Sequence, residues 1–329
     1  MGHADDYICE ADTVVVGRKG SINNPIFVEE PFWNVDTAFG LTAKRDVLLP
    51  RYLYYFCRNF NFEQLNKAVT IPSLTKSDLL KIEITLPSLD IQQEITNKLL
   101  KVEQIIQARK QQLQKLDELV KARFVEMFGD PVTNPQKWRL VELGELTEIG
   151  SSKRIFEKEY VLDGVPFYRT KEIVELSKGN PITTELYITE NRFAEIKQQY
   201  GVPKAGDLLI SAVGTIGVIW IVDGKNDFYF KDGNLIRVNG SDKFNPIYMK
   251  NLLENLIAEY KKKISSGTAY AALTISGLTK MKVYDVPMGL QNQFATFVKQ
   301  VDKSKATVQK ALDEAQLLFD SLMQTYFDE

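Results

Sequence analysis

The chain has 329 residues, of which 44% are hydrophobic and 26% are charged, and its 41 basic and 43 acidic side chains leave a formal net charge of -2. This length allows two or three folded domains, while the apolar share excludes a disordered or fibrous protein and the charge balance confines any nucleic-acid binding to a local surface. The one histidine, His3, and the two cysteines, Cys9 and Cys57, argue against histidine-dependent catalysis, zinc clusters and a disulfide framework.

An internal repeat organises the chain from its first predicted strand onward. Gly20-Ser21-Ile22 follows the apolar run 13–16 in the same way that Gly214-Thr215-Ile216 follows the run 208–210, and the match continues with Leu74-Thr75 and Leu273-Thr274. Residues 10–89 therefore correspond to 204–289, and the first copy has no counterpart of 131–203. We expect residues 1–89 to form a partial domain.

Each copy runs into a long helical pattern, predicted to span residues 90–130 and 290–329. Apolar residues recur at alternating spacings of four and three, the heptad pattern of packed helices. Two arrangements fit: each helix packs on its own domain, or the two pair antiparallel. A helix of roughly 57 Å, at 1.5 Å per residue, favours pairing. The expected core of the pair is Ile95, Leu99, Val102, Ile106, Leu113, Leu116, Val120, Phe294, Val298, Val301, Val308, Leu312, Phe319 and Leu322.

Residues 131–289 are predicted to form one complete domain. Short β-branched and aromatic runs bounded by Gly, Pro and Asp predict strands at 165–168, 208–210, 217–222 and 234–238. Helical stretches at 191–199 and 246–263 interrupt them, so the predicted fold class is α+β.

No catalytic signature emerges from the motifs. Asn24-Pro25-Ile26-Phe27 lacks the second proline of a base-flipping methyltransferase motif, and the spacing of 217–226 is wrong for a phosphate-binding loop. We therefore expect a chain that is not an enzyme and that binds no metal.

Residues suited to nucleic-acid binding cluster in a few loops. Guanidinium groups suit base edges and ammonium groups suit phosphates, although solvated loops and helix ends explain the same residues about equally well. Between residues 131 and 289 there are 21 lysines and arginines against 19 aspartates and glutamates. The candidate DNA-binding residues are Lys153, Arg154, Arg169, Thr170, Lys171, Thr215, Thr268 and Tyr270, with Arg18, Lys19 and Ser21 in the first copy. Of these, Arg169 is the predicted base reader and Lys153 the predicted phosphate contact.

The order of several motifs carries a resemblance. They are Trp138 with 140–146, Gly150, Gly164–Arg169, Gly206–Ser211, Gly214–Gly217, Gly267–Ala269, Leu273-Thr274 and the Pro287/Gln291 entry to a long helix. Together with the repeat and the two helices, they resemble the DNA specificity subunit of Type I restriction–modification systems. The resemblance implies two target recognition domains joined by two long antiparallel, coiled-coil-like helices. Here it implies an amino-terminally truncated member, with recognition domains at 1–89 (partial) and 131–289 (complete) and spacer helices at 90–130 and 290–329.

The same resemblance implies the function and the partners. Members bind double-stranded DNA and direct adenine methylation and restriction; the modification subunits use S-adenosylmethionine, and the restriction subunits use ATP with magnesium. This chain is expected to bind none of these cofactors, to be cytoplasmic and to have no membrane partner. The alternative is a truncated assembly protein that pairs with or sequesters modification subunits without bipartite DNA recognition. Phe32, Trp33, Phe39 and Phe56 are expected to lie uncovered on the partial domain, which would then self-associate or accept a complementary fragment.

Overall fold

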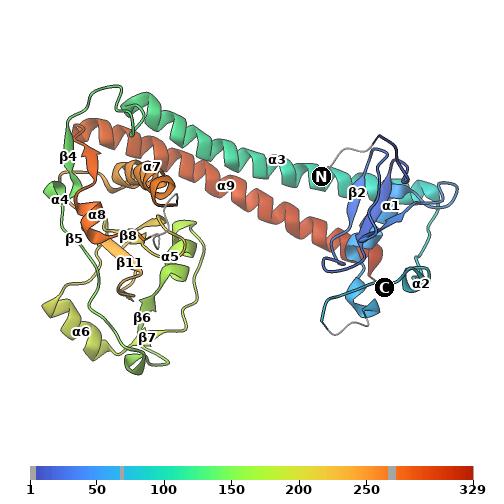
Figure 1. Cartoon of the computed structure of the whole chain (residues 1–329), viewed down its shortest axis with the longest axis horizontal. Helices are drawn as coiled ribbons and strands as arrows, with labels where there is room; N and C mark the ends of the chain where they lie inside the picture. The colour runs from blue at the N-terminus through green and yellow to red at the C-terminus, as the bar shows by residue number, and fades with distance from the viewer. Residues whose placement is uncertain (1–4, 67–69, 266–271, 329) are drawn as a thin grey trace. The chain divides into compact units, whose positions relative to one another are not determined.

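The computed structural model describes residues 5–66, 70–265 and 272–328, which fold into two compact units (Figure 1). Unit 1 comprises residues 1–114 and 305–329, and unit 2 comprises residues 115–304. The strands are β1 Thr13–Gly17, β2 Ile26–Val28, β3 Ala38–Leu41, β4 Leu140–Glu142, β5 Ile149–Gly150, β6 Val165–Tyr168, β7 Tyr187–Ile188, β8 Leu208–Ser211, β9 Ile219–Ile221, β10 Tyr229–Phe230, β11 Leu235–Val238 and β12 Lys282–Tyr284. The helices are α1 Pro50–Asn59, α2 Lys76–Leu79, α3 Leu89–Phe128, α4 Leu143–Leu146, α5 Thr170–Ser177, α6 Glu190–Gln199, α7 Pro246–Ser265, α8 Ile275–Thr279 and α9 Met288–Phe327, with 3-10 turns η1 Phe62–Leu65 and η2 Glu157–Glu159. In these described parts of the chain, no helix combines the length and the apolar character needed to cross a bilayer.

Unit 1 is built on a three-stranded antiparallel sheet in the order β2-β1-β3. The β-branched residues of β1 explain its central place, because Val14 and Val16 are fully buried on one face. Helix α1 contributes Cys57 to the same core, which also contains Phe62 and Leu74. Of the four aromatic residues expected to lie uncovered, only Trp33 is exposed, and the other three are half-buried. Phe39 and Phe56 pack against the core of unit 1, so the expectation was wrong for these two residues.

Unit 2 contains three small sheets. A four-stranded antiparallel sheet has the order β5-β11-β8-β9, a second sheet has the order β10-β6-β7, and β12 pairs with β4. In the second sheet β6 pairs parallel with β10 and antiparallel with β7. Every strand and helix predicted between 131 and 289 is confirmed to within three residues, and so is the α+β fold class.

The two long helices pair antiparallel in both units. In unit 1, Leu99 and Ile106 of α3 share a core with Phe319 of α9. In unit 2, Phe124 of α3 packs with Phe294 of α9, with ring centroids 5.4 Å apart. The paired arrangement predicted from the heptads is therefore the one that the chain adopts.

The heptad pattern correctly predicts most of the apolar contact between the two long helices, which we call the seam, and fails at one end of each helix. Ten of the expected core residues are buried, and Leu113, Leu116, Leu312 and Leu322 are half-buried. After Val120 the buried positions advance by four twice, to Phe124 and Phe128, and after Phe319 the next buried position is Met323. The buried face shifts there because these helix ends also pack against α1 and α7. Phe327 of α9 contacts Tyr52 of α1, and Phe128 of α3 contacts Tyr248 of α7.

The internal repeat extends to individual hydrogen bonds. The Ile22 amide donates to the Gly20 carbonyl at 2.8 Å, as the Ile216 amide donates to the Gly214 carbonyl at 2.9 Å. Both glycines have a positive φ, of 77° and 74°, which L side chains rarely adopt. Sequence and backbone geometry thus identify one duplicated turn.

A buried glutamine ties each long helix to its own globular part. The Gln92 side-chain oxygen accepts from the Leu49 amide at 2.9 Å, and its nitrogen donates to the carbonyls of Val47 and Pro87. The Gln291 oxygen accepts from the Asn245 amide at 2.8 Å, and its nitrogen donates to the Val286 carbonyl at 2.8 Å. These bonds cross-link the start of the long helix to the segment before α1 or α7, so we call the two side chains the glutamine latches.

Replacing a latch should destabilise its unit. In Gln291→Glu the side chain cannot donate to the Val286 carbonyl and places a charge in a site that is 2% exposed. We expect the free energy of unfolding to fall by about 1–3 kcal/mol. Urea titration followed by circular dichroism measures this, with Gln293→Glu, the same change on the exposed face of α9, as the control. Equal urea midpoints for the two variants would contradict the role of the latch.

Candidate nucleic-acid interface

The parallel pair of β6 and β10 brings three distant segments together in unit 2. The Lys231 amide donates to the Tyr168 carbonyl at 2.9 Å, so the ends of both strands lie side by side. The Lys153 amide donates to the Tyr229 hydroxyl at 2.6 Å, which attaches the segment after β5 to the same place. We call the cationic residues at this point the basic edge: Lys153, Arg154, Arg169, Lys171 and Lys231. Five of the predicted DNA-binding residues, Thr170 among them, therefore come together at these strand ends.

Two cations of the basic edge are held by neutral or acidic neighbours. Arg154 Nε donates to Asp232 Oδ2 at 2.8 Å, while its side chain stays 67% exposed. The Lys153 ammonium lies 5.3 Å from the centroid of the Tyr200 ring, a cation–π distance. Asp232 thus directs Arg154, and Tyr200 directs Lys153.

Arg169 is engaged more tightly than the others. Its guanidinium donates to Glu172 Oε1 at 2.9 Å, and its amide donates to Glu172 Oε2 at 2.8 Å, at the start of α5. The Glu172 side chain is 1% exposed, so Arg169 supplies the counter-charge for a buried carboxylate. Hydrogen bonding to Glu172 raises the pKa of the Arg169 guanidinium. The predicted base reader therefore also has a structural partner.

Unpaired polar groups gather on the same segments. Among the described residues, Ser152 Oγ, Thr170 Oγ1 and Asp232 Oδ1 have no hydrogen-bond partner although each atom is buried. Within the same ranges, neither the Lys153 nor the Lys171 ammonium forms an ion pair. Of these groups, the exposed Lys153 and Lys171 ammonium groups can bind phosphates, whereas the three buried atoms are not accessible to a ligand in this structure.

The remaining predicted residues lie elsewhere. Thr215 is exposed on the β8–β9 loop, and its carbonyl accepts from the Ser211 hydroxyl. Arg18, Lys19 and Ser21 are exposed on the equivalent loop of unit 1, where Arg18 donates to the Asp36 carbonyl at 3.2 Å. Thr268 and Tyr270 lie outside the described residues.

Sequence reasoning missed Lys231 of the basic edge and Asp232, the acidic partner of Arg154. Asp232 belongs to the turn Lys231-Asp232-Gly233, where Gly233 has a φ of 74°. That turn follows the aromatic strand β10, and a polar turn directly after a buried strand was the available signal. What the sequence could not supply was the parallel pairing with β6.

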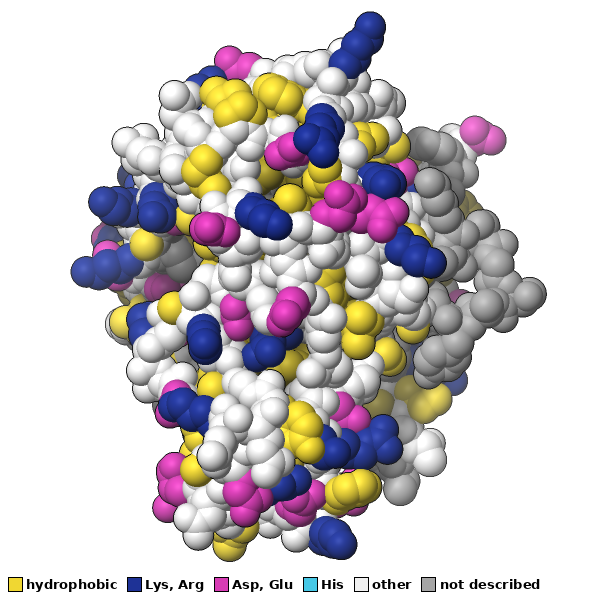
Figure 2. Space-filling view, turned by 90° about the vertical axis from the view of Figure 1, so that its left-hand side faces the viewer, with side chains coloured by type: hydrophobic (Ala, Val, Ile, Leu, Met, Phe, Trp, Pro, Cys, Tyr) yellow, Lys and Arg dark blue, Asp and Glu magenta, His cyan; other side chains and the backbone are white. Residues whose placement is uncertain are grey.

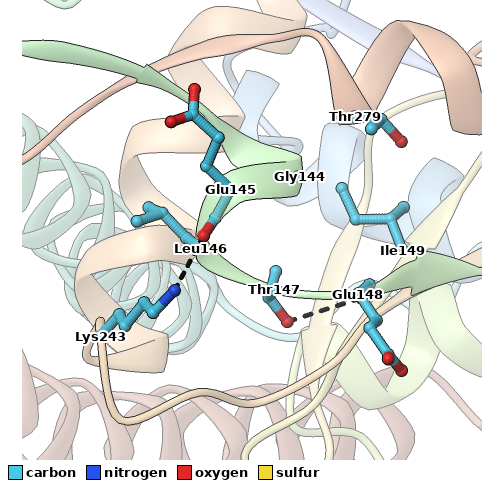
Figure 3. Close-up of a pocket in the computed structure, with 8 residues that line it drawn as sticks. All are labelled: Gly144, Glu145, Leu146, Thr147, Glu148, Ile149, Lys243 and Thr279. Carbon is cyan, nitrogen blue, oxygen red and sulfur yellow. Dashed lines mark hydrogen bonds between the residues drawn. The ribbon is translucent and has the colours of Figure 1, made fainter.

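Charge is mixed on one face of the molecule. In the face shown in Figure 2, Lys and Arg side chains alternate with Asp and Glu side chains and hydrophobic residues. An open groove of about 610 Å³ is lined by residues 144–149 with Lys243 and Thr279 (Figure 3). The Lys243 ammonium there donates to the Glu145 carbonyl at 2.9 Å, while Glu145 and Glu148 carry negative charge. This groove is unsuited to a phosphate backbone, which leaves the basic edge as the candidate interface.

The described ranges contain no group of three or more His, Cys, Asp and Glu side chains placed to hold a metal ion. The expectation that this chain binds no metal or cofactor stays a prediction. What the structure does define is a class of chain: two copies of one α+β element joined to an antiparallel helix pair.

Comparison with known proteins identifies the family. A family model described as the Type I restriction modification DNA specificity domain matches residues 1–118 and 135–316. The chain belongs to this family.

Two relatives agree with this assignment. A Haemophilus influenzae protein named as a candidate type I restriction enzyme specificity subunit is 26% identical over 323 residues, covering 94% of this chain and 80% of that protein. The type I restriction enzyme MjaIX specificity subunit of Methanocaldococcus jannaschii is 23% identical over 337 residues, covering 94% of this chain and 73% of that protein.

Solved structures share the fold. The S subunit of a type I restriction-modification system from M. genitalium superposes with a TM-score of 0.61 at 17% identity, covering 100% of this chain and 86% of that one. A chain from a structure describing complex assembly and conformational transition of the type I R-M system gives a TM-score of 0.62 at 19% identity, with coverages of 97% and 81%.

The structural role of Arg169 is testable apart from DNA. In Arg169→Ala, the buried Glu172 loses its counter-charge, and since Arg169 is 35% exposed, we expect a loss of about 1–2 kcal/mol. Lys171→Ala, which removes an exposed charge two residues away, should leave stability within about 0.5 kcal/mol of the parent. Chemical denaturation measures both, and equal stabilities would show that Glu172 does not depend on Arg169.

Proposed function

We propose that the chain is a sequence-specific DNA-binding subunit that directs Type I modification and restriction subunits to a target sequence. One observation carries the DNA-binding part: the exposed cationic side chains of Lys153, Arg154 and Lys171 gather where β6 and β10 end. Membership of the specificity family supports the assignment. Recognition domains at 1–89 and 131–289, with helices at 90–130 and 290–329, remain part of this proposal.

The interaction partners of the basic-edge residues indicate which of them bind phosphates and which bind bases. Lys153 and Lys171, which have no ion pair among the described residues, bind phosphates and fix register. Arg154 is 67% exposed and is aimed by Asp232, so it is available to a base edge. Arg169 reads a base through whichever of its N–H groups remain beyond those bonded to Glu172.

The partners are modification subunits and a restriction subunit, and S-adenosylmethionine, ATP and magnesium bind to those subunits rather than to this chain. Exposed leucines on α9 support docking. Leu317 and Leu318 are 72% and 51% exposed in unit 1, and large apolar side chains on an otherwise polar helix face favour a protein partner. The same surface supports the second candidate, an assembly protein that holds modification subunits without reading a bipartite site.

Phosphate contacts should appear in the salt dependence of DNA binding. For the chain in complex with modification subunits, Lys153→Ala and Lys171→Ala should each lower the salt slope by about one unit and weaken all sequences alike. Lys178→Ala is the matched control, because it removes a charge at the opposite end of α5 that is already paired with Glu175 at 2.9 Å. The target is first selected from random DNA by band-shift, and affinities follow from fluorescence anisotropy. Identical slopes for all three variants would exclude the basic edge as the DNA surface, and uniform binding without an enriched site would favour the second candidate.

Docking through α9 should depend on the apolar side chain of Leu317. Leu317→Ala should weaken co-purification with modification subunits about tenfold, a loss of about 1.4 kcal/mol. Leu317→Met keeps a flexible apolar side chain at this position and should co-purify with modification subunits as the parent does. Because this position is exposed, both variants should unfold at the parent urea concentration. Undiminished co-purification of Leu317→Ala would place the docking surface elsewhere.

A further inference from the structure

In unit 2, one short segment completes three surfaces. Residues 139–150 contribute β4, which pairs with β12; α4, which packs beside α8; and β5, which pairs with β11. The fit at α8 is close, because a Cβ on Gly144 would lie 2.5 Å from the Thr279 Cγ2. Figure 3 shows Gly144 to Ile149 running past Thr279 and Lys243. We call residues 139–150 the closing segment.

The repeat identifies the matching surfaces in unit 1. The Arg18 amide donates to the Thr37 carbonyl in the same way that the Ala212 amide donates to the Asn234 carbonyl. Strand β3 therefore corresponds to β11, and Gly40 corresponds to Arg237. Thr75 and Thr274 both cap short helices through their hydroxyls, which makes Leu80 the counterpart of Thr279. Residues 82–86 then correspond to 281–285, which include β12.

The outer edge of β3 has backbone groups open to pairing. In an antiparallel ladder, residues alternate between facing the partner strand and facing away. Thr37 faces β1 through its bond to Arg18, so Ala38, Gly40 and Thr42 face outward. Asn34 donates to the Ala38 carbonyl at 3.0 Å, but within residues 5–66, 70–265 and 272–328 the amides of Gly40 and Thr42 have no partner. In unit 2 the corresponding outward groups of Arg237 and Asn239 are covered by Gly150 and Glu148.

The other two surfaces are uncovered as well. Leu80 is 76% exposed at the position where Gly144 covers Thr279 in unit 2. Among the described residues, no strand pairs with Ile82, Ile84 or Leu86, and Leu86 is 45% exposed. The Thr85 carbonyl, which lies between Ile84 and Leu86 in the chain, accepts from the Tyr52 hydroxyl at 3.2 Å. Three neighbouring vacancies in unit 1 therefore match the three surfaces that one continuous segment covers in unit 2.

We propose that unit 1 is an acceptor for a strand–turn–strand peptide segment of the 139–150 type, with a small residue at its turn and apolar residues on its first strand. Its first strand would pair with residues 82–86, its turn would place a small residue on Leu80, and its second strand would pair with the edge of β3. Val141 and Leu143, which are 6% and 0% exposed in unit 2, define the apolar character that the occupant needs. Open strand edges favour this kind of strand addition.

The test uses the full chain and a synthetic peptide with the sequence of residues 138–150. Hydrogen exchange read by mass spectrometry should show that excess peptide slows exchange at 38–42 and 82–86 about tenfold or more. Exchange at 235–239 and 281–285 should not change, because those strands are already covered in unit 2. If 38–42 and 82–86 exchange slowly without peptide, or if peptide leaves their rates unchanged, the proposal is overturned.

Matched variants keep the result specific. In the chain, Leu80→Asp should weaken peptide binding about tenfold in fluorescence anisotropy, whereas Lys81→Asp, at the adjacent exposed position, should not. In the peptide, Gly144→Val should abolish binding, since a side chain there would meet Leu80. Equal binding by the Leu80→Asp and Lys81→Asp chains would overturn the assignment of the surface. Unit 2 carries the DNA contacts proposed above, so either result leaves that proposal to its own test.

Discussion

The glutamine latches are the interaction on which the rest of the structure depends. An amide side chain that is buried must satisfy both its donor and its acceptor. Gln92 and Gln291 do so with backbone groups from two segments each, the one before α1 or α7 and the one just before the long helix. Those bonds fix where each long helix begins and which of its faces turns toward α1 or α7. Once the first turn is fixed, the rotation of every later residue follows from the 3.6-residue period. The two buried side chains therefore set which face of each long helix begins the apolar contact between the helices.

The aromatic residues at the far end of each helix respond to the same constraint. Phe124 stacks on Tyr248 with ring centroids 5.9 Å apart, and Tyr52 lies 5.1 Å from Phe327. A helix that ends against a globular core has to satisfy two neighbours, the partner helix and α1 or α7. Two successive steps of four residues widen the apolar stripe to face both, which a strict heptad of three and four cannot do. The shifted seam is a consequence of ending a coiled-coil-like pair in an α+β core.

Sequence alone predicted the elements whose signal is local and periodic. The two long helices, the helices at 191–199 and 246–263 and the strands at 208–210, 217–222 and 234–238 follow from spacing and turn chemistry and are found as predicted, and so is the duplicated turn at Gly20 and Gly214. The basic edge could be predicted only in part. Lys153 and Arg169 stand out as residues, but their neighbourhood depends on the parallel pairing of β6 with β10, which joins segments about sixty residues apart. The Arg169–Glu172 pair was missed for a different reason, because a carboxylate three residues away on a helix gives no sign in sequence that it will be buried.

The buried Glu172 carboxylate helps to explain how a surface with nearly equal numbers of positive and negative charges could bind DNA. Arg154 and Arg169 of the basic edge each form an ion pair with an acidic residue. Their guanidinium groups are therefore held in fixed orientations but add little to the net positive charge of the surface. Lys153 and Lys171 supply the field, since no described carboxylate pairs with them. A few phosphate contacts give weak, salt-sensitive attraction, while guanidinium groups held by acidic partners lose less side-chain entropy when they meet a base edge. In the DNA-binding role proposed above, a small excess of positive charge would be sufficient, because affinity would depend on the two ammonium groups and discrimination on how firmly Asp232 and Glu172 hold the arginines.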